Sequence, residues 1–189
     1  MFPDSIQAVI NRVDRLRAEV DDHYQIPRDE ALVLAQLLGI GRSISICEIG
    51  TSYGFSTLHL AAMAQRHGGH VHTIDKDPKK VAAATANLRD AGLLAVVTVH
   101  QGDARELLAT IRPIAPFDFV FIDATKEQSD AYLDAVLPRL APHCVLVTDN
   151  TTTHADELAS FVARLRLLEG FQSCSVPVGN GFELTVRLG

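Results

Sequence analysis

Residues 45–56 read SICEIGTSYGFS. The first five residues form a short, mostly apolar run of the length and composition typical of a buried strand. Gly50 and Gly54 bracket a turn, and apolar residues then return at helical intervals, with Ser56 as the expected cap of that helix. A strand, a glycine turn and a helix in this order predict the first unit of an α/β fold.

The same alternation continues along the chain. We expect further strands at residues 70–74, 96–100, 117–122, 144–148, 172–176 and 182–188. We expect helices near the N-terminus and at about residues 28–38, 56–67, 78–91, 104–111, 129–140 and 155–168. Strands that alternate with helices require right-handed crossovers. The sequence therefore predicts an α/β fold: a doubly wound, mostly parallel, Rossmann-like seven-stranded sheet that closes with a C-terminal antiparallel hairpin.

Composition narrows the class of protein. The 189 residues, of which 47% are hydrophobic, fit one domain over residues 1–189, with helices in residues 1–42 covering the site. The net charge is −6 and no stretch is strongly basic, which argues against a nucleic-acid partner. We see no signal-peptide pattern and no apolar run near the roughly 20 residues of a membrane span. Three unpaired cysteines read as buried thiols, so a cytoplasmic location is expected.

The turn at residues 50–54 predicts a cofactor site. Glycines let the backbone approach a ligand, and the helix N-terminus behind them favours a phosphate or a carboxylate. Asp75 ends the next strand, where an acid can accept hydrogen bonds from ribose hydroxyls. A dinucleotide site has a middle glycine, but Ser52 stands there. Glu48 suits a cofactor with a positive end, so S-adenosylmethionine is favoured over NAD.

A family resemblance rests on the motifs Glu48-x-Gly50-Thr51-x-x-Gly54-x-Ser56, Asp75, Gly102-Asp103-Ala104, Asp123-Ala124-Thr125-Lys126 and Asp149-Asn150. In these the chain resembles the metal-dependent O-methyltransferases, which include catechol and caffeoyl-coenzyme A O-methyltransferases. The resemblance implies transfer of a methyl group from S-adenosylmethionine to a hydroxyl of a small acceptor. It assigns cofactor binding to Glu48, Gly50, Thr51, Ser52, Gly54, Ser56, Asp75, Lys76, Asp103, Ala104 and Asp123.

Three oxygen-bearing side chains follow the fourth and fifth expected strands. Asp123 comes after the fourth strand, and Asp149 and Asn150 follow the fifth. If these strands are neighbours, the three side chains converge on one edge and offer the ligands that Mg²⁺ prefers. As an alternative, Asp and Asn after strands serve as turn and helix-cap residues. The resemblance assigns a divalent cation, Mg²⁺ or else Mn²⁺ or Ca²⁺, to these same positions.

Lys126 lies three residues after Asp123 and can face the same pocket if a helix begins there. The resemblance makes Lys126 and Asp123 catalytic, with the lysine as general base; the alternative is an ordinary surface lysine. His154 is a second pocket candidate, whereas His70 and His72 read as structural. The short stretch between Asp149 and the next helix leaves little acceptor cover, which puts catechol-like acceptors in doubt.

Two rival functions stay open. One is an NAD-dependent oxidoreductase, which the missing middle glycine disfavours. The other is a non-catalytic cofactor-binding module, which the polar residues at every strand end disfavour. The expected partner is a small-molecule hydroxyl acceptor, with no nucleic acid and no membrane, and the resemblance makes a homodimer an option.

Overall fold

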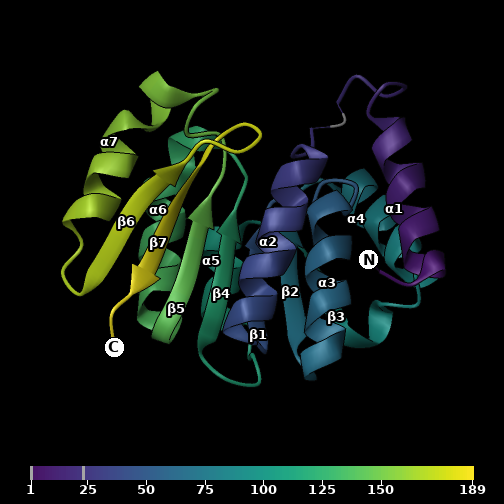
Figure 1. Ribbon diagram of the computed structural model, residues 1–189, viewed down its shortest axis with the longest axis horizontal. Helices are drawn as coiled ribbons and strands as arrows, with labels where there is room; N and C mark the ends of the chain where they lie inside the picture. The colour runs from purple at the N-terminus through teal and green to yellow at the C-terminus, as the bar shows by residue number, and fades with distance from the viewer. Residues whose placement is uncertain (1, 23) are drawn as a thin grey trace.

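The computed structural model describes residues 2–22 and 24–189 (Figure 1). Its strands are β1 (Ser45–Ile49), β2 (His70–Asp75), β3 (Val97–Gln101), β4 (Phe117–Ile122), β5 (Leu140–Thr148), β6 (Phe171–Val176) and β7 (Phe182–Arg187). Its helices are α1 (Asp4–Leu16), α2 (Arg28–Gly41), α3 (Phe55–His67), α4 (Pro78–Asp90), α5 (Ala104–Thr110), α6 (Ser129–Val136) and α7 (Ala155–Leu167). Short 3-10 turns are η1 (Leu94–Val96), η2 (Lys126–Gln128) and η3 (Leu137–Arg139).

The strands form a seven-stranded sheet in the order β3-β2-β1-β4-β5-β7-β6. Every pair from β3 to β5 is parallel, whereas β7 runs antiparallel to both β5 and β6. The order reverses between β1 and β4, which is where ligands bind in doubly wound sheets. The predicted fold class, with its C-terminal hairpin, is confirmed.

Helices cover both faces of the sheet (Figure 1). Helices α1 to α4 pack on one face and α5 to α7 on the other, each over its own apolar cluster. Strand β4 contributes side chains to both clusters. Phe119 and Phe121 belong to the first cluster, and Val120 and Ile122 belong to the second. This alternation follows from the two-residue period of a strand. Along the described chain we find no helix with the length and apolar character that crossing a membrane requires.

Three expectations about local structure were wrong. Ser56 is not the cap of α3, because Gly54 adopts a left-handed φ of 86° and already holds the cap position. Helix α6 ends at Val136 instead of residue 140, because Pro138 cannot donate the helical hydrogen bond and the chain tightens into η3. Cys174 is exposed, because it lies on β6 at the edge of the sheet.

Gly50 lies at the point where β1 meets the loop after β4. Its φ is 106°, and a Cβ on it would lie only 1.9 Å from the carbonyl oxygen of Asp123. The backbone N–H of Asp123 donates to the carbonyl of Ile49 at 2.9 Å, which holds the two strand ends together. A side chain at residue 50 would therefore separate strands that the site needs side by side.

A histidine group lies at the β2–β3 end of the sheet. Nδ1 of His72 lies 3.0 Å from Nε2 of His100, and the two rings stack with centroids 5.3 Å apart. The ring of His70 lies beside that of His72, with Nε2 2.8 Å from Thr98 Oγ1. Burial, and then the neighbouring His70, His100 and Arg139, lowers the pKa of His72 to about 4.

We predict that the buried His72 makes the protein lose stability in mild acid. The unfolded chain binds a proton at this residue near pH 6.5, but the folded protein binds it only near pH 4. Acidification through this window therefore favours unfolding, by about 3 kcal/mol in total. The test is urea denaturation between pH 7 and pH 4 for wild type, His72→Gln and the control His143→Asn. The glutamine variant should lose less stability across the window, and an unchanged pH slope would contradict the prediction.

We predict that Gly50→Ala lowers the free energy of unfolding by about 3 kcal/mol or more, because the new methyl group clashes with rigid backbone in addition to its unfavourable φ. Gly92→Ala is the matched control. Gly92 also has a positive φ, of 70°, but no described atom lies within 4 Å of its added Cβ. It should cost only about 1 kcal/mol. Equal losses in the two variants, measured by chemical denaturation, would show that the contact with Asp123 is unimportant.

Candidate functional site

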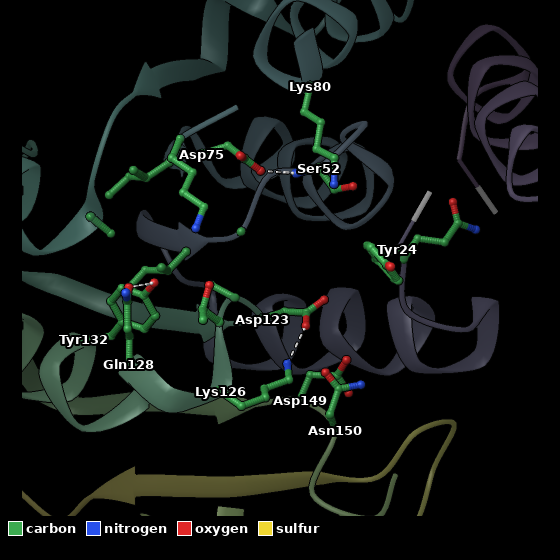
Figure 2. Close-up of a pocket in the computed structure, with 18 of the residues that line it drawn as sticks. Tyr24, Ser52, Asp75, Lys80, Asp123, Lys126, Gln128, Tyr132, Asp149 and Asn150 are labelled. Atoms are coloured by element: carbon green, nitrogen blue, oxygen red, sulfur yellow. Dashed lines mark hydrogen bonds and ion pairs between the residues drawn. The ribbon is translucent and has the colours of Figure 1, made fainter. Parts of the chain in front are cut away.

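A cavity of about 890 Å³ opens at the carboxyl ends of the parallel strands. The loops after β1, β2, β3, β4 and β5 all contribute to its wall, together with residues of the segment 17–25 and Asn180. Figure 2 shows Asp75 and Ser52 on one side of this space and Asp123, Lys126, Asp149 and Asn150 on the other. The cavity thus has two halves, one built by β1 to β3 and one built by β4 and β5.

The first half is organised by Asp75 at the end of β2. Its Oδ2 accepts a hydrogen bond from the backbone N–H of Ser52 at 2.8 Å, and its Oδ1 accepts one from Asp77 at 2.9 Å. Ser52 adopts a positive φ of 46°, which turns its N–H toward Asp75. Because a carboxylate oxygen has two lone pairs, each oxygen keeps one for a ligand. Asp75 is thereby fixed in place and still able to bind.

Other predicted cofactor residues also line this half. Gly50, Ser52, Lys76, Asp103 and Ala104 all contribute to the wall. Asp103 caps α5 through the N–H of Arg105 and pairs with the Arg105 guanidinium at 2.5 Å. Hydrogen bonding from Arg105 lowers the pKa of Asp103 to about 2. The side chain is therefore a permanent anion at the end of β3.

Four predicted cofactor residues lie outside the described cavity wall: Glu48, Thr51, Gly54 and Ser56. The carboxylate of Glu48 is buried and accepts hydrogen bonds from Thr57 Oγ1 at 2.5 Å and Thr73 Oγ1 at 2.6 Å. Burial raises the pKa of Glu48 to about 7, against the hydrogen bonds from Ser56, Thr57 and Thr73. These contacts join β1, β2 and α3 beneath the glycine turn, so Glu48 supports the turn from behind.

The second half gathers the predicted metal and catalytic residues. Backbone hydrogen bonds from Asp123 to Ile49 and from Asp149 to Ile122 keep the ends of β1, β4 and β5 level. The two acids therefore face one cavity. Lys126 Nζ lies 3.1 Å from Asp123 Oδ1, so η2 does turn the lysine toward the acid as predicted. Asn150 holds its place with a left-handed φ of 68°.

In this half Lys126 pairs with Asp123, but Asp149 makes no ion pair among the described residues. Burial raises the pKa of Asp123 to about 6, with a further rise from Asp149 and an opposing effect of Lys126. Burial, and then the neighbouring Glu30, raises the pKa of Asp149 to about 8. Both carboxylate oxygens of Asp149 are buried without a hydrogen-bond partner among the described residues. Unpaired buried carboxylates are costly, so a cation would stabilise this arrangement.

The residues present fit a hard divalent cation. Asp123, Asp149 and Asn150 offer carboxylate and amide oxygens, the donors that Mg²⁺ takes while it keeps several waters. In residues 2–22 and 24–189 no group of three or more His, Cys, Asp and Glu side chains is arranged to hold a metal ion. The candidate set has only two acids beside its amide, so it is an open site and not a closed cage.

Several residues of the cavity wall were not among the site residues predicted from the sequence. Residues of the segment 17–25, among them Tyr24, reach the cavity from the N-terminus, and Asn180 reaches it from the β6–β7 link. The Tyr132 hydroxyl donates to Gln128 Oε1 at 2.7 Å, and both side chains line the wall (Figure 2). His154, a candidate from the sequence, also lines it, with Nδ1 2.9 Å from Glu157 Oε1. Tyr24 and Asn180 lie far along the chain from any motif, whereas Gln128 and Tyr132 closely follow Lys126.

The chain matches known proteins over the same region. The family described as "Methyltransferase domain" matches residues 47–151. The chain is 37% identical over 134 residues to a catechol O-methyltransferase from Mycobacterium tuberculosis, covering 68% of this chain and 60% of that protein. It is 34% identical over 120 residues to another from Niastella koreensis, covering 62% of this chain and 52% of that protein. The chain thus spans little more than half the length of these curated relatives.

A solved O-methyltransferase from Bacillus cereus, in complex with SAH, superposes with a TM-score of 0.84 at 25% identity. The match covers 98% of this chain and 91% of that one. The predicted resemblance to the catechol O-methyltransferases is confirmed by the two curated relatives. Because the matched residues 47–151 are more than half of its 189 residues, the chain belongs to the methyltransferase domain family.

Proposed function

We propose that this chain is an S-adenosylmethionine-dependent O-methyltransferase that acts on a hydroxyl of a small acceptor with the help of a divalent cation. One observation carries the proposal: the anchored Asp75 and the unpaired Asp149 face one cavity, on opposite sides of the β1–β4 switch point. Asp75 can accept hydrogen bonds from the ribose of a nucleoside, and Asp149 can bind a cation. The names of the relatives, and the SAH in the Bacillus cereus structure, support the same reading.

The cofactor would occupy the half built by β1 to β3. Asp75 would accept hydrogen bonds from the ribose hydroxyls, and Asp103 with Ala104 would bind the adenine. The turn at Gly50 and Ser52 would hold the methionine end, in the same cavity as Asp123 and Lys126. Glu48, Thr51, Gly54 and Ser56 would act from behind the wall by shaping that turn, since Glu48 bonds to Thr57 and Thr73 and not into the cavity.

The acceptor would lie in the half built by β4 and β5. Asp123, Asp149 and Asn150 would hold the cation, which when bound lowers the pKa of the acceptor hydroxyl. Lys126, 3.1 Å from Asp123, would take the proton of that hydroxyl when its side chain is the neutral amine. The oxygen then forms a bond to the methyl carbon as the carbon–sulfur bond breaks and SAH leaves. The sulfonium is already activated, so alignment of the two reactants is the main task of the site.

The acceptor is expected to be small and only partly enclosed. Strand β5 ends at Thr148 and α7 begins at Ala155, so a short turn is all that follows the predicted metal ligands. Cover comes instead from the N-terminal segment that carries Tyr24 and Gln25. We therefore place catechol acids first among the acceptors to test, followed by other small phenols.

Methyl transfer is predicted to depend on the cation and on Asp149. With labelled S-adenosylmethionine, a catechol acid and Mg²⁺, wild type should turn over, and EDTA should remove the activity until Mg²⁺ is restored. Asp149→Asn should lower kcat/KM at least ~100-fold, because it removes a buried anionic ligand. Asp156→Asn, an exposed acid on α7, is the control and should change nothing. Turnover that persists in EDTA would remove the cation from the proposal and leave Lys126 as the base.

Cofactor binding is predicted to depend on Asp75 and to exclude NAD. Calorimetry should detect binding of SAH but not of NAD to wild type. Asp75→Asn should weaken SAH roughly 30-fold through loss of charge-assisted hydrogen bonds to the ribose. Glu106→Gln, an exposed acid in the first turn of α5, should bind SAH as wild type does. Binding of NAD in place of SAH would instead favour an oxidoreductase.

A further inference from the structure

Glu30 is a buried acid that the proposed reaction does not use. It lies in the first turn of α2, and none of its surface is exposed. Its Oε2 accepts a hydrogen bond from the backbone N–H of Asn180 at 3.1 Å, across 150 residues of sequence. Carboxylates are rarely fully buried unless they are paired. This single hydrogen bond therefore offsets only a small part of the free-energy cost of burying a charged group.

The link between β6 and β7 packs closely against the carboxyl group of Glu30. Gly179 in the link has a left-handed φ of 61°, and a Cβ there would lie 2.5 Å from Glu30 Oε2. The carbonyl of Asn180 accepts from the N–H groups of Thr152 and Thr153, directly after the predicted metal ligands. Glu30 is thus connected through Asn180 to the turn that follows Asp149 and Asn150.

Glu30 also lies directly beside Asp149. The two carboxyl groups are in direct contact, and the charge of Glu30 raises the pKa of Asp149. Asp149 lines the cavity and Glu30 does not, so Glu30 lies behind Asp149. Oε1 of Glu30, like both oxygens of Asp149, is buried with no hydrogen-bond partner in the part of the chain that the structure describes. Lys126 is the cation that acts on both acids.

Another buried glutamate of this protein has its charge paired in full. Glu183 on β7 is also fully buried, but both of its oxygens are satisfied. They accept hydrogen bonds from Arg166, Ser173 and Ser175 at 2.6 to 3.1 Å. No arginine hydrogen-bonds to Glu30, and its Oε1 has no hydrogen-bond partner among the described residues. Its burial is explained if positive charge arrives at Asp149 from the cavity.

We propose that Glu30 is the positioning residue of the cation site: it holds Asp149 from behind and joins the cation to the β6–β7 link. The inference rests on the proposed function, because it assumes that a divalent cation binds at Asp149. A divalent cation on the cavity side would favour the ionised form of both groups and offset the repulsion between the two carboxylates. Groups that orient a metal ligand from outside usually change metal affinity 10- to 100-fold when they are replaced.

The test is Mn²⁺ binding, measured by calorimetry and by electron paramagnetic resonance, without any acceptor. Glu30→Gln keeps the shape and can still accept from Asn180, but it loses the charge. It should bind Mn²⁺ at least 10-fold more weakly and change the spectrum of the bound ion. Asp29→Asn is the matched control: the same chemical change, one residue away in the same helical turn, on an exposed side chain. It should bind Mn²⁺ within twofold of wild type.

Two further measurements separate positioning from folding. In EDTA, Glu30→Gln should melt close to wild type, because the amide keeps the shape of the side chain and the hydrogen bond from Asn180, and its affinity for SAH should be unchanged within twofold. Gly179→Ala would place a methyl group 2.5 Å from Glu30 Oε2, which must then shift, and the variant should also weaken Mn²⁺ binding.

The possible results are distinct. If wild type binds Mn²⁺ and both Glu30→Gln and Gly179→Ala bind it equally well, the role of Glu30 is overturned while the cation site stands. If wild type binds no Mn²⁺ but binds SAH, the cation and the role of Glu30 fall together, and the cofactor assignment remains.

Discussion

The close contact between Gly50 and the carbonyl of Asp123 is the constraint on which the rest of the site depends. At the β1–β4 junction the strand order reverses, and the ends of these two strands must lie in contact for their loops to share one cavity. A residue with a Cβ would hold them apart, since that atom would fall 1.9 Å from a backbone oxygen. With glycine there, Asp75 and Ser52 face Asp123 and Lys126 across a single space (Figure 2).

The two halves of the cavity differ in how their charges are satisfied. In the half of β1 to β3, backbone N–H groups bind Asp75 and an arginine binds Asp103, so both anions are stable without a ligand. In the half of β4 and β5, Lys126 contacts Asp123 while Asp149 and Glu30 have little to oppose their charge. The first half is preorganised, whereas the second has buried acids whose charge the proposed cation would balance.

Segments from both ends of the chain complete this second half. Helix α2 brings Glu30 from the N-terminal part, and the β6–β7 link brings Asn180 from the C-terminal part, so the proposed cation site is bordered by segments that meet only in the folded protein (Figure 1). The antiparallel hairpin is therefore more than an added edge of the sheet. Its link carries the backbone that fixes the turn after Asp149.

The sequence by itself determined the fold class and the motif residues at the strand ends. Strand and helix periodicity, glycine turns and acids after strands are local properties, so they could be read before the structure was known. Glu48 and Ser56 show what the motif could not predict. It places both residues near the cofactor, but whether a side chain faces the cavity or the core depends on the packing of α3 on β1 and β2. Glu30, Tyr24 and Asn180 could not be predicted at all. Contacts across 150 residues leave no local pattern, and only the closed tertiary structure brings these groups to Asp149 and the cavity wall.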